Sequence, residues 1–183
     1  MAYLRQNIVQ EVLGEYFEVS QPTVSRIISQ LTPVVADVLD EFIPNATEAT
    51  QSRVVLVDGT LTPCWSWAGH RELHPGKHKT TGHSLQVLAN LGGDIIYISQ
   101  PQVGSMHDVE AFRQTGLAEI LDLSNTIGDK GYISVGVDTP TRKPIGHELA
   151  ESQKKENSSI NSLRAAVERA IAHVKNWRVL HTD

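Results

Sequence analysis

The spacing of apolar side chains predicts two helices near the start of the chain. Residues 8–19 carry apolar groups at three- and four-residue intervals, which is the pattern of one helical face. Ser20 and Pro22 predict the start of a second helix, because serine is a common N-cap and proline is tolerated in a first turn. We expect Pro33 to kink or break this helix, while the apolar pattern resumes after it and ends before Pro44. The side chains expected to face inward from the second helix are Val24, Ile27, Ile28 and Leu31.

After a polar linker at residues 44–52, the pattern becomes that of a strand. Residues 54–57 are all aliphatic and do not alternate with polar groups, which predicts a strand buried on both faces. The run stops at Asp58, so we expect this carboxylate at the end of the strand, held by rigid backbone and within reach of solvent. A carboxylate there suits a hard cation such as Mg²⁺. The alternative is that Asp58 and Gly59 form an ordinary turn.

The remaining pattern mixes strands and helices. Apolar runs at residues 83–91 and 94–100 flank a Gly-Gly-Asp turn and predict a hairpin. A helix then runs to about residue 121, and a short strand follows over residues 126–133. The last helix is expected over residues 160–177, with a buried stripe of Ile160, Leu163, Val167, Ile171 and Val174.

These elements divide the chain into a helical module, residues 1–48, and an α/β domain, residues 50–183. Two helices joined by a short capped turn have the layout of a helix-turn-helix, which places its second helix against DNA. The early positions of that helix carry polar groups able to hydrogen-bond bases or phosphates. A plain helical hairpin that serves only for packing is the alternative. The positions expected to contact DNA are Gln21, Thr23, Ser25, Arg26 and Gln30.

Composition narrows the class of protein. The 183 residues are 40% apolar and 20% charged, which is ordinary for a soluble globular protein. No apolar run approaches the roughly 20 residues that span a bilayer, and the first residues do not resemble a signal peptide. The single cysteine, Cys64, excludes an internal disulfide and fits a reducing cytoplasm. We therefore expect a cytoplasmic protein with no membrane partner.

Charge is distributed unevenly along the chain. The net charge of −5 argues mildly against nucleic acid, but residues 140–183 hold eight Lys or Arg against five Asp or Glu. A phosphate-binding face can therefore lie on the C-terminal half. Three histidines between residues 70 and 78 are spaced four apart, but a Pro-Gly pair interrupts them and we do not expect zinc. A loop in which Lys77 and Lys79 contact a phosphate backbone is the better interpretation.

Three carboxylates are candidates for one site. Asp58 and Asp129 each end a predicted strand, and Glu168 lies beside the buried stripe of the last helix. Neighbouring strands can place terminal aspartates side by side, and two divalent cations would offset their repulsion and support displacement at phosphorus. Arg164 and Lys175 share the helical face of Glu168, as expected for a helix lying along a phosphate backbone. An ordinary solvated face with charge pairs is the alternative.

Five motifs in order resemble the DDE superfamily of transposases, in the branch of bacterial insertion-sequence and eukaryotic Harbinger-type enzymes. The resemblance covers about residues 53–183, and the helix-turn-helix also resembles the segment that precedes the catalytic domain in this family. The family pattern Y-x2-R-x3-E-x6-K is matched at Arg164, Glu168 and Lys175, but Asn161 replaces the tyrosine. The motifs are Val-Asp-Gly-Thr, Gly-Lys-His-Lys-Thr-Thr-Gly-His, Gly-Ser-Met-His-Asp, Gly-Asp-Lys-Gly-Tyr and Val-Glu-Arg-Ala-Ile-Ala-His-Val-Lys.

The resemblance implies an RNase H-like α/β fold, a mixed sheet with flanking helices whose first and fourth strands are adjacent. On that topology Asp129, rather than Asp108, is the second metal ligand, and Asp108 is a supporting residue or a further ligand. Asp58 would bridge two Mg²⁺ or Mn²⁺ ions, with Asp129 and Glu168 each completing one coordination shell. The cations expected to hold phosphates are Lys77, Lys79, Arg164 and Lys175.

The resemblance also implies a transposase that cuts the ends of a transposable element and joins them to target DNA. Its partners would be double-stranded DNA, both terminal inverted repeats and target, with homo-oligomers allowed and a nucleoid-associated location. Two alternatives are open. One is an inactive DNA-binding remnant, truncated where the chain stops just after the last helix and family members continue. The same metal chemistry would also serve a nuclease acting on RNA.

Overall fold

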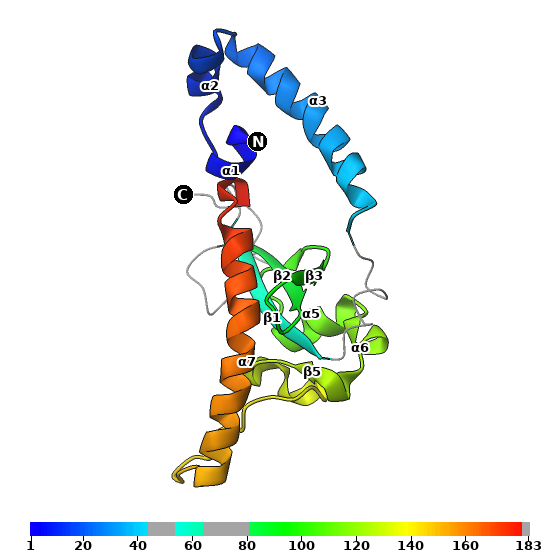
Figure 1. Cartoon of the computed structure of the whole chain (residues 1–183), viewed down its shortest axis with the longest axis vertical. Helices are drawn as coiled ribbons and strands as arrows, with labels where there is room; N and C mark the ends of the chain where they lie inside the picture. The colour runs from blue at the N-terminus through cyan, green and yellow to red at the C-terminus, as the bar shows by residue number, and fades with distance from the viewer. Residues whose placement is uncertain (44–53, 64–80, 181–183) are drawn as a thin grey trace.

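A computed structural model describes residues 1–43, 54–63 and 81–180 of the chain. A slender helical segment precedes an α/β domain, and the long helix α7 (Glu151–Lys175) runs along one side of that domain (Figure 1). The interpretations placed on the three histidines, on Lys77 and on Lys79 fall outside the described residues. No helix in the described part of the chain is both long and apolar enough to cross a membrane.

The N-terminal segment contains the predicted pair of helices. Helix α2 (Gln10–Phe17) and helix α3 (Gln21–Asp40) are joined by a short turn, and Ser20 is the N-cap of α3 as predicted. Gly14 permits this turn, because a Cβ at that position would lie 2.7 Å from the Val19 carbonyl oxygen. The sequence pattern did not reveal α1 (Ala2–Gln6), a further short helix.

Two expectations for α3 were wrong, namely a break at Pro33 and burial of the whole apolar face. The helix continues through Pro33, which removes one backbone hydrogen bond but does not end the element. Pro33 is exposed, so water can satisfy the carbonyl that loses its partner. The apolar face is also not buried as expected: Val24 is buried, whereas Ile27 and Leu31 are about half exposed. The periodicity identified the helix, but in the described residues α2 covers only its first turns.

The α/β domain is built on a mixed five-stranded sheet. The main path has the order β3-β2-β1-β5, and the short β4 pairs with β2. Strands β1 and β2 are antiparallel, β2 and β3 form the predicted antiparallel hairpin, and β1 and β5 are parallel. The strand that precedes Asp129 is therefore the neighbour of the strand that carries Asp58, which confirms the expected topology. The strands are β1 (Val55–Pro63), β2 (Gly82–Ala89), β3 (Ile95–Ile98), β4 (Gln102–Val103) and β5 (Thr126–Ile127).

Helices pack on both faces of the sheet because the strands bury side chains on both. One apolar cluster joins Val55 and Val57 to Phe112 of α5 (Asp108–Gln114) and Leu117 of α6 (Leu117–Ile120). The single helix predicted here is two, because Gly116 adopts a left-handed conformation with φ of 72° and separates them. The second cluster packs Leu56, Val87 and Ile127 against α7 through Ala166, Val167, Ala170 and Ile171.

Helix α7 begins earlier than predicted and presents a narrower apolar face. Val167 and Ile171 are buried as expected, whereas Leu163 is exposed and small residues, Ala166 and Ala170, complete the contact with the sheet. The C-terminal end of α7 leads to a short 3₁₀ turn, η4 (Arg178–Leu180), which packs against α1. There the Arg5 guanidinium lies over the Trp177 ring, 5.2 Å from its centroid. Figure 1 shows α1 beside this end of α7.

Candidate active site

The parallel pairing of β1 and β5 places Asp58 and Asp129 at matching positions. Val55 pairs with Thr126 and Leu56 with Ile127, so each aspartate follows the last paired residue of its strand by two positions. Asp58 does not end its strand as predicted, because β1 continues to Pro63 in register with β2. It instead lies just beyond the point where the pairing with β5 stops, and its side chain is 19% exposed.

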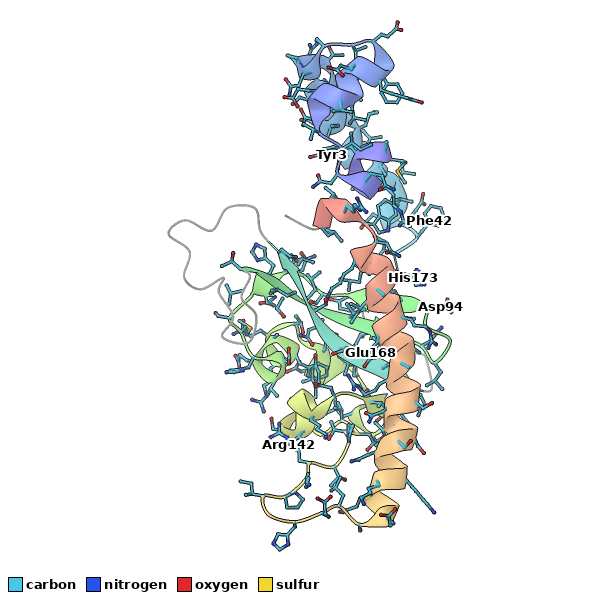
Figure 2. The ribbon with its side chains drawn as sticks, turned by 90° about the vertical axis from the view of Figure 1, so that its left-hand side faces the viewer. Tyr3, Phe42, Asp94, Arg142, Glu168 and His173 are labelled. Atoms are coloured by element: carbon cyan, nitrogen blue, oxygen red, sulfur yellow. The ribbon has the colours of Figure 1, made fainter. Side chains whose placement is uncertain are left out.

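Helix α7 supplies two charged side chains to Asp58. Arg164 places its Nη2 atom 3.4 Å from Asp58 Oδ2 and 3.7 Å from Glu168 Oε1. The Arg164 side chain is only 13% exposed, whereas Glu168 is 59% exposed and lies on the part of α7 that runs beside the sheet (Figure 2). We expected Arg164 to hold phosphate. It is instead the cation shared by two of the predicted metal ligands.

Burial and charge together raise the pKa of Asp58 to about 6. Burial is the largest cause, and the nearby carboxylates of Asp129 and Glu168 raise the pKa further. The Arg164 guanidinium and the Gly59 N–H, which donates to Asp58 Oδ1 at 2.9 Å, act in the opposite direction. Asp58 therefore lies within the electrostatic range of both other predicted ligands.

Asp129 is held by the turn that follows β5. It is the N-cap of the 3₁₀ helix η3 (Lys130–Val135), and its Oδ1 accepts a hydrogen bond from the Gly131 N–H at 2.7 Å. The same helix carries Tyr132, whose hydroxyl donates to Gln86 Oε1 of β2 at 2.6 Å. Burial, reinforced by three aspartates, raises the Tyr132 pKa well above its usual value, so the hydroxyl stays protonated and keeps this anchor.

Asp108 lies closer to this site than the sequence indicated. A Cβ added to Gly59 would lie 2.7 Å from Asp108 Oδ1, and a Cβ added to Gly131 would lie 3.1 Å from Asp108 Oδ2. The two glycines therefore leave the space that the carboxylate occupies. The Asp108 charge also acts on Tyr132, as do the charges of Asp58 and Asp129. The glycines in the Asp-Gly-Thr and Asp-Lys-Gly-Tyr motifs were the available signal, because glycine permits such close approach.

The donor set fits a hard divalent cation. Carboxylate oxygens from Asp58, Asp129 and Glu168 are the ligand type that Mg²⁺ and Mn²⁺ prefer, and a guanidinium already balances two of them. In the present side-chain arrangement, no three His, Cys, Asp or Glu residues of the described chain are close enough together to hold a metal ion. Side-chain rotation that releases Arg164 is therefore required before an ion can be held by Asp58 and Glu168 together.

The predicted DNA contacts at the start of α3 are only partly available. The Gln21 amide donates to Gln10 Oε1 of α2 at 2.7 Å, which uses it within the hairpin. Thr23 shares a hydrogen bond with Ser20, with 2.9 Å between the hydroxyl oxygens. Ser25 is half-buried and Arg26 is exposed. Lys175 is exposed near the end of α7, two turns beyond Glu168.

A mixed sheet of this order, covered by helices on both faces, is the arrangement expected of an RNase H-like domain. The sequence profile described as "DDE superfamily endonuclease" matches residues 57–183, and the profile described as "Helix-turn-helix of DDE superfamily endonuclease" matches residues 1–41. The chain therefore belongs to the DDE superfamily endonucleases, a family of transposases.

Two relatives agree with this assignment over almost the whole chain. A protein of Streptomyces albus G, named as a transposase for insertion sequence element IS112, is 28% identical over 98% of this chain and 67% of its own length. A protein of Microchaete diplosiphon, named as a transposase for insertion sequence element IS702, is 34% identical over 97% of this chain and 68% of its own length. No solved structure matches the chain at a significant level.

Proposed function

We propose that this transposase cleaves DNA strands at the ends of a transposable element and joins them to target DNA, using divalent cations held by Asp58, Asp129 and Glu168. The observation that carries the proposal is the register of β1 and β5. In this register each aspartate lies two residues beyond the last paired residue of its strand, and Arg164 of α7 contacts both Asp58 and Glu168. Bound Mg²⁺ or Mn²⁺, as two ions, would supply positive charge to the reacting phosphate.

The protein groups around the site have separable roles. The Gly59 N–H orients Asp58, and the N-cap hydrogen bond orients Asp129. The contacts of Arg164 at 3.4 and 3.7 Å are longer than the roughly 2.8 Å of a strong charge-assisted hydrogen bond. The proposal requires this guanidinium to turn to a phosphate oxygen when DNA and divalent cations are bound, because the cations would then balance the buried charge of Asp58. Lys175 lies further along the same helix and extends this positive face along the DNA backbone.

Asp108 supports the site from the opposite side of β1. Its carboxylate occupies the space left by Gly59 and Gly131, beside the backbone that carries Asp58 and Asp129. We assign it the role of a positioning residue that fixes both strands, with direct coordination as the alternative. Double-stranded DNA bearing the terminal repeat is the proposed substrate, and Arg26 of α3 is its proposed contact outside the catalytic domain.

Nicking of a supercoiled plasmid that carries the element ends tests the proposal. We expect nicking with Mg²⁺ or Mn²⁺, its loss in Asp58→Asn, and its retention in Asp138→Asn, which changes an exposed aspartate of the same domain. Mn²⁺ should also raise the melting temperature of the wild type and of Asp138→Asn but not that of Asp58→Asn. Repeat binding without any nicking by the wild type would contradict cleavage, and nicking that survives Asp58→Asn would contradict the site.

A further inference from the structure

We propose that Gln86 and Tyr132 act together as positioning residues that fix the turn carrying Asp129 against strand β2. This role rests on the proposed function, because Asp129 is a metal ligand only in that proposal. The two side chains are joined by a hydrogen bond of 2.6 Å from the Tyr132 hydroxyl to Gln86 Oε1. The bond connects residues that are 46 positions apart, so it ties together two segments that the chain itself does not hold close.

Gln86 interrupts a buried apolar run of β2 at residues 85–89. Its side chain is fully buried, and its neighbours Leu85 and Val87 are buried too. Gln86 Oε1 accepts from Tyr132, whereas Nε2 has no hydrogen-bond partner within the described part of the chain. A buried donor without a partner lowers stability, and a leucine at this position would carry no such cost. A polar group that costs stability in a core is typical of a position that serves the site.

The register of β1 and β2 places Gln86 on the side of the sheet where Asp108 and Tyr132 lie. Gln86 pairs directly with Gly59, and the side chains of directly opposed residues project from the same face. On that face, a Cβ added to Gly59 would lie 2.7 Å from Asp108 Oδ1 and 3.3 Å from the Tyr132 hydroxyl oxygen. The hydrogen bond between Gln86 and Tyr132 therefore lies beside Gly59, the residue that follows Asp58.

The Tyr132 ring is held close to the backbone that carries Asp129. The ring packs edge-on against Phe112, with 5.7 Å between the ring centroids. It also covers Gly128, where an added Cβ would lie 3.1 Å from the ring. The Tyr132 N–H donates to the Asp129 carbonyl oxygen at 3.1 Å, and the Gly131 N–H donates to Asp129 Oδ1 at 2.7 Å. A shift of the ring must therefore move the Asp129 carboxylate with it.

The hydrogen bond to Gln86 adds a constraint that packing does not supply. Apolar contact is not directional, so the contact with Phe112 permits small shifts along the axis of the Tyr132 ring. A short hydrogen bond has a preferred distance and angle, so the Gln86 carbonyl fixes the ring along this axis. Ligands of a metal must be held to within about 0.5 Å, and outer groups that orient them change metal affinity by about 10–100-fold. We therefore expect the bond to matter more for metal binding than for the fold.

Two single variants and their combination separate positioning from packing. Tyr132→Phe leaves the Gln86 amide buried without a partner, and Gln86→Met leaves the Tyr132 hydroxyl in the same state. Each should therefore lower the melting temperature in EDTA, whereas the double variant removes both polar groups and should recover most of it. The Mn²⁺ affinity of the double variant, measured by electron paramagnetic resonance of the free ion, should stay at least about tenfold below that of the wild type. Tyr97→Phe removes a hydroxyl from a half-buried ring on the same apolar cluster and should match the wild type.

Amide hydrogen exchange without any metal tests the position of the Asp129 turn directly. In EDTA, the Gly131 N–H of the double variant should exchange at least about tenfold faster than in the wild type, with the amides of β1 and β2 unchanged. An unchanged Gly131 exchange rate, or Mn²⁺ affinity that recovers together with the melting temperature, would overturn the positioning role. A wild type that binds no Mn²⁺ would contradict the proposed function instead. The Gly131 exchange rate would then still decide whether Gln86 and Tyr132 position Asp129.

Discussion

Asp58 has a higher affinity for a proton in the folded chain than in the unfolded one. Burial raises its pKa from 3.8 to about 6, so the folded state binds more protons than the unfolded state between about pH 4 and pH 6. Stability must therefore fall as the pH rises through this range when no divalent ion is present. Above pH 6 the folded chain carries a buried charge that only Arg164 balances in part.

The first prediction follows from this shift. In EDTA, Asp58→Asn should gain free energy of unfolding relative to the wild type as the pH rises, from near zero at pH 4 to about 1–2 kcal/mol at pH 8. The gain is below the full effect of the pKa shift because relaxation and water penetration reduce the cost of a buried charge. Urea denaturation at several pH values measures the difference, with Asp138→Asn expected to stay parallel to the wild type. A constant difference between pH 4 and pH 8 would show that Asp58 is not buried in this way.

The second prediction concerns the space that Gly59 leaves for Asp108. In Gly59→Ala the new methyl group would lie 2.7 Å from Asp108 Oδ1, so the carboxylate must move while the strand persists. We expect plasmid nicking to fall at least about tenfold, since small displacements in an active site have large effects. Unfolding free energy should fall by only about 1 kcal/mol. Adding Asp108→Ala should restore that stability, and unchanged nicking in Gly59→Ala would contradict the placement of Asp108.

At the scale of elements, α3 shows how far a local pattern determines structure. Its N-cap and periodicity are local, and they were sufficient to predict where the helix begins. Periodicity does not specify what the apolar side faces, since a domain core and another helix demand the same spacing. That is why Ile27 and Leu31 were expected to be buried and are exposed.

The third prediction tests the effect of Pro33 within this helix. Pro33→Ala restores a backbone N–H in line with the Ser29 carbonyl and removes the clash of the ring. We expect slower amide exchange in the middle of α3, corresponding to a gain of about 1–3 kcal/mol in local stability. Thr32→Ala, at the adjacent exposed position, should gain at most about 0.5 kcal/mol. Equal protection in the two variants would mean that the helix is already broken at Pro33 in solution.

In the sheet and the site, too, some features could be predicted from neighbouring residues, whereas others depend on tertiary packing. The β2–β3 hairpin and α7 were predicted because each is specified by neighbouring residues. The adjacency of β1 and β5 came from the family resemblance, since nothing in the two strands themselves encodes which strand is the neighbour. Asp108 was interpreted from its helical position alone. Its place beside Gly59 depends on how α5 packs across the sheet, and residue spacing contains no such information.

At the scale of the whole molecule, a small contact within the described residues joins the helical segment to the α/β domain. Helix α1 packs on η4 at the end of α7, where Arg5 lies over Trp177. A cation–π pair of this kind contributes on the order of 1 kcal/mol. The first helix of the N-terminal segment therefore contacts the short turn that follows the helix carrying Glu168.

The fourth prediction tests the contact between the N-terminal helices and the α/β domain. Trp177→Ala should broaden the distance distribution measured by small-angle X-ray scattering, because the N-terminal helices lose their contact with the turn that follows α7. Nicking of a short duplex without the terminal repeat should be unaffected, whereas preference for repeat-bearing DNA should fall. Val174→Ala changes a half-buried residue one turn earlier and serves as the matched control. An unchanged scattering profile in Trp177→Ala would show that the contact does not hold the parts together.

The parallel pairing of two residues of β1 with two residues of β5 has an evolutionary consequence. Each aspartate lies two residues beyond the last paired residue of its own strand. Loops gained or lost between the strands therefore leave the positions of the two carboxylates unchanged. Distant relatives can therefore differ widely in the length of that intervening segment while keeping the same chemistry. Homologues are better aligned on the two strand positions than on the number of amino acids that separates them.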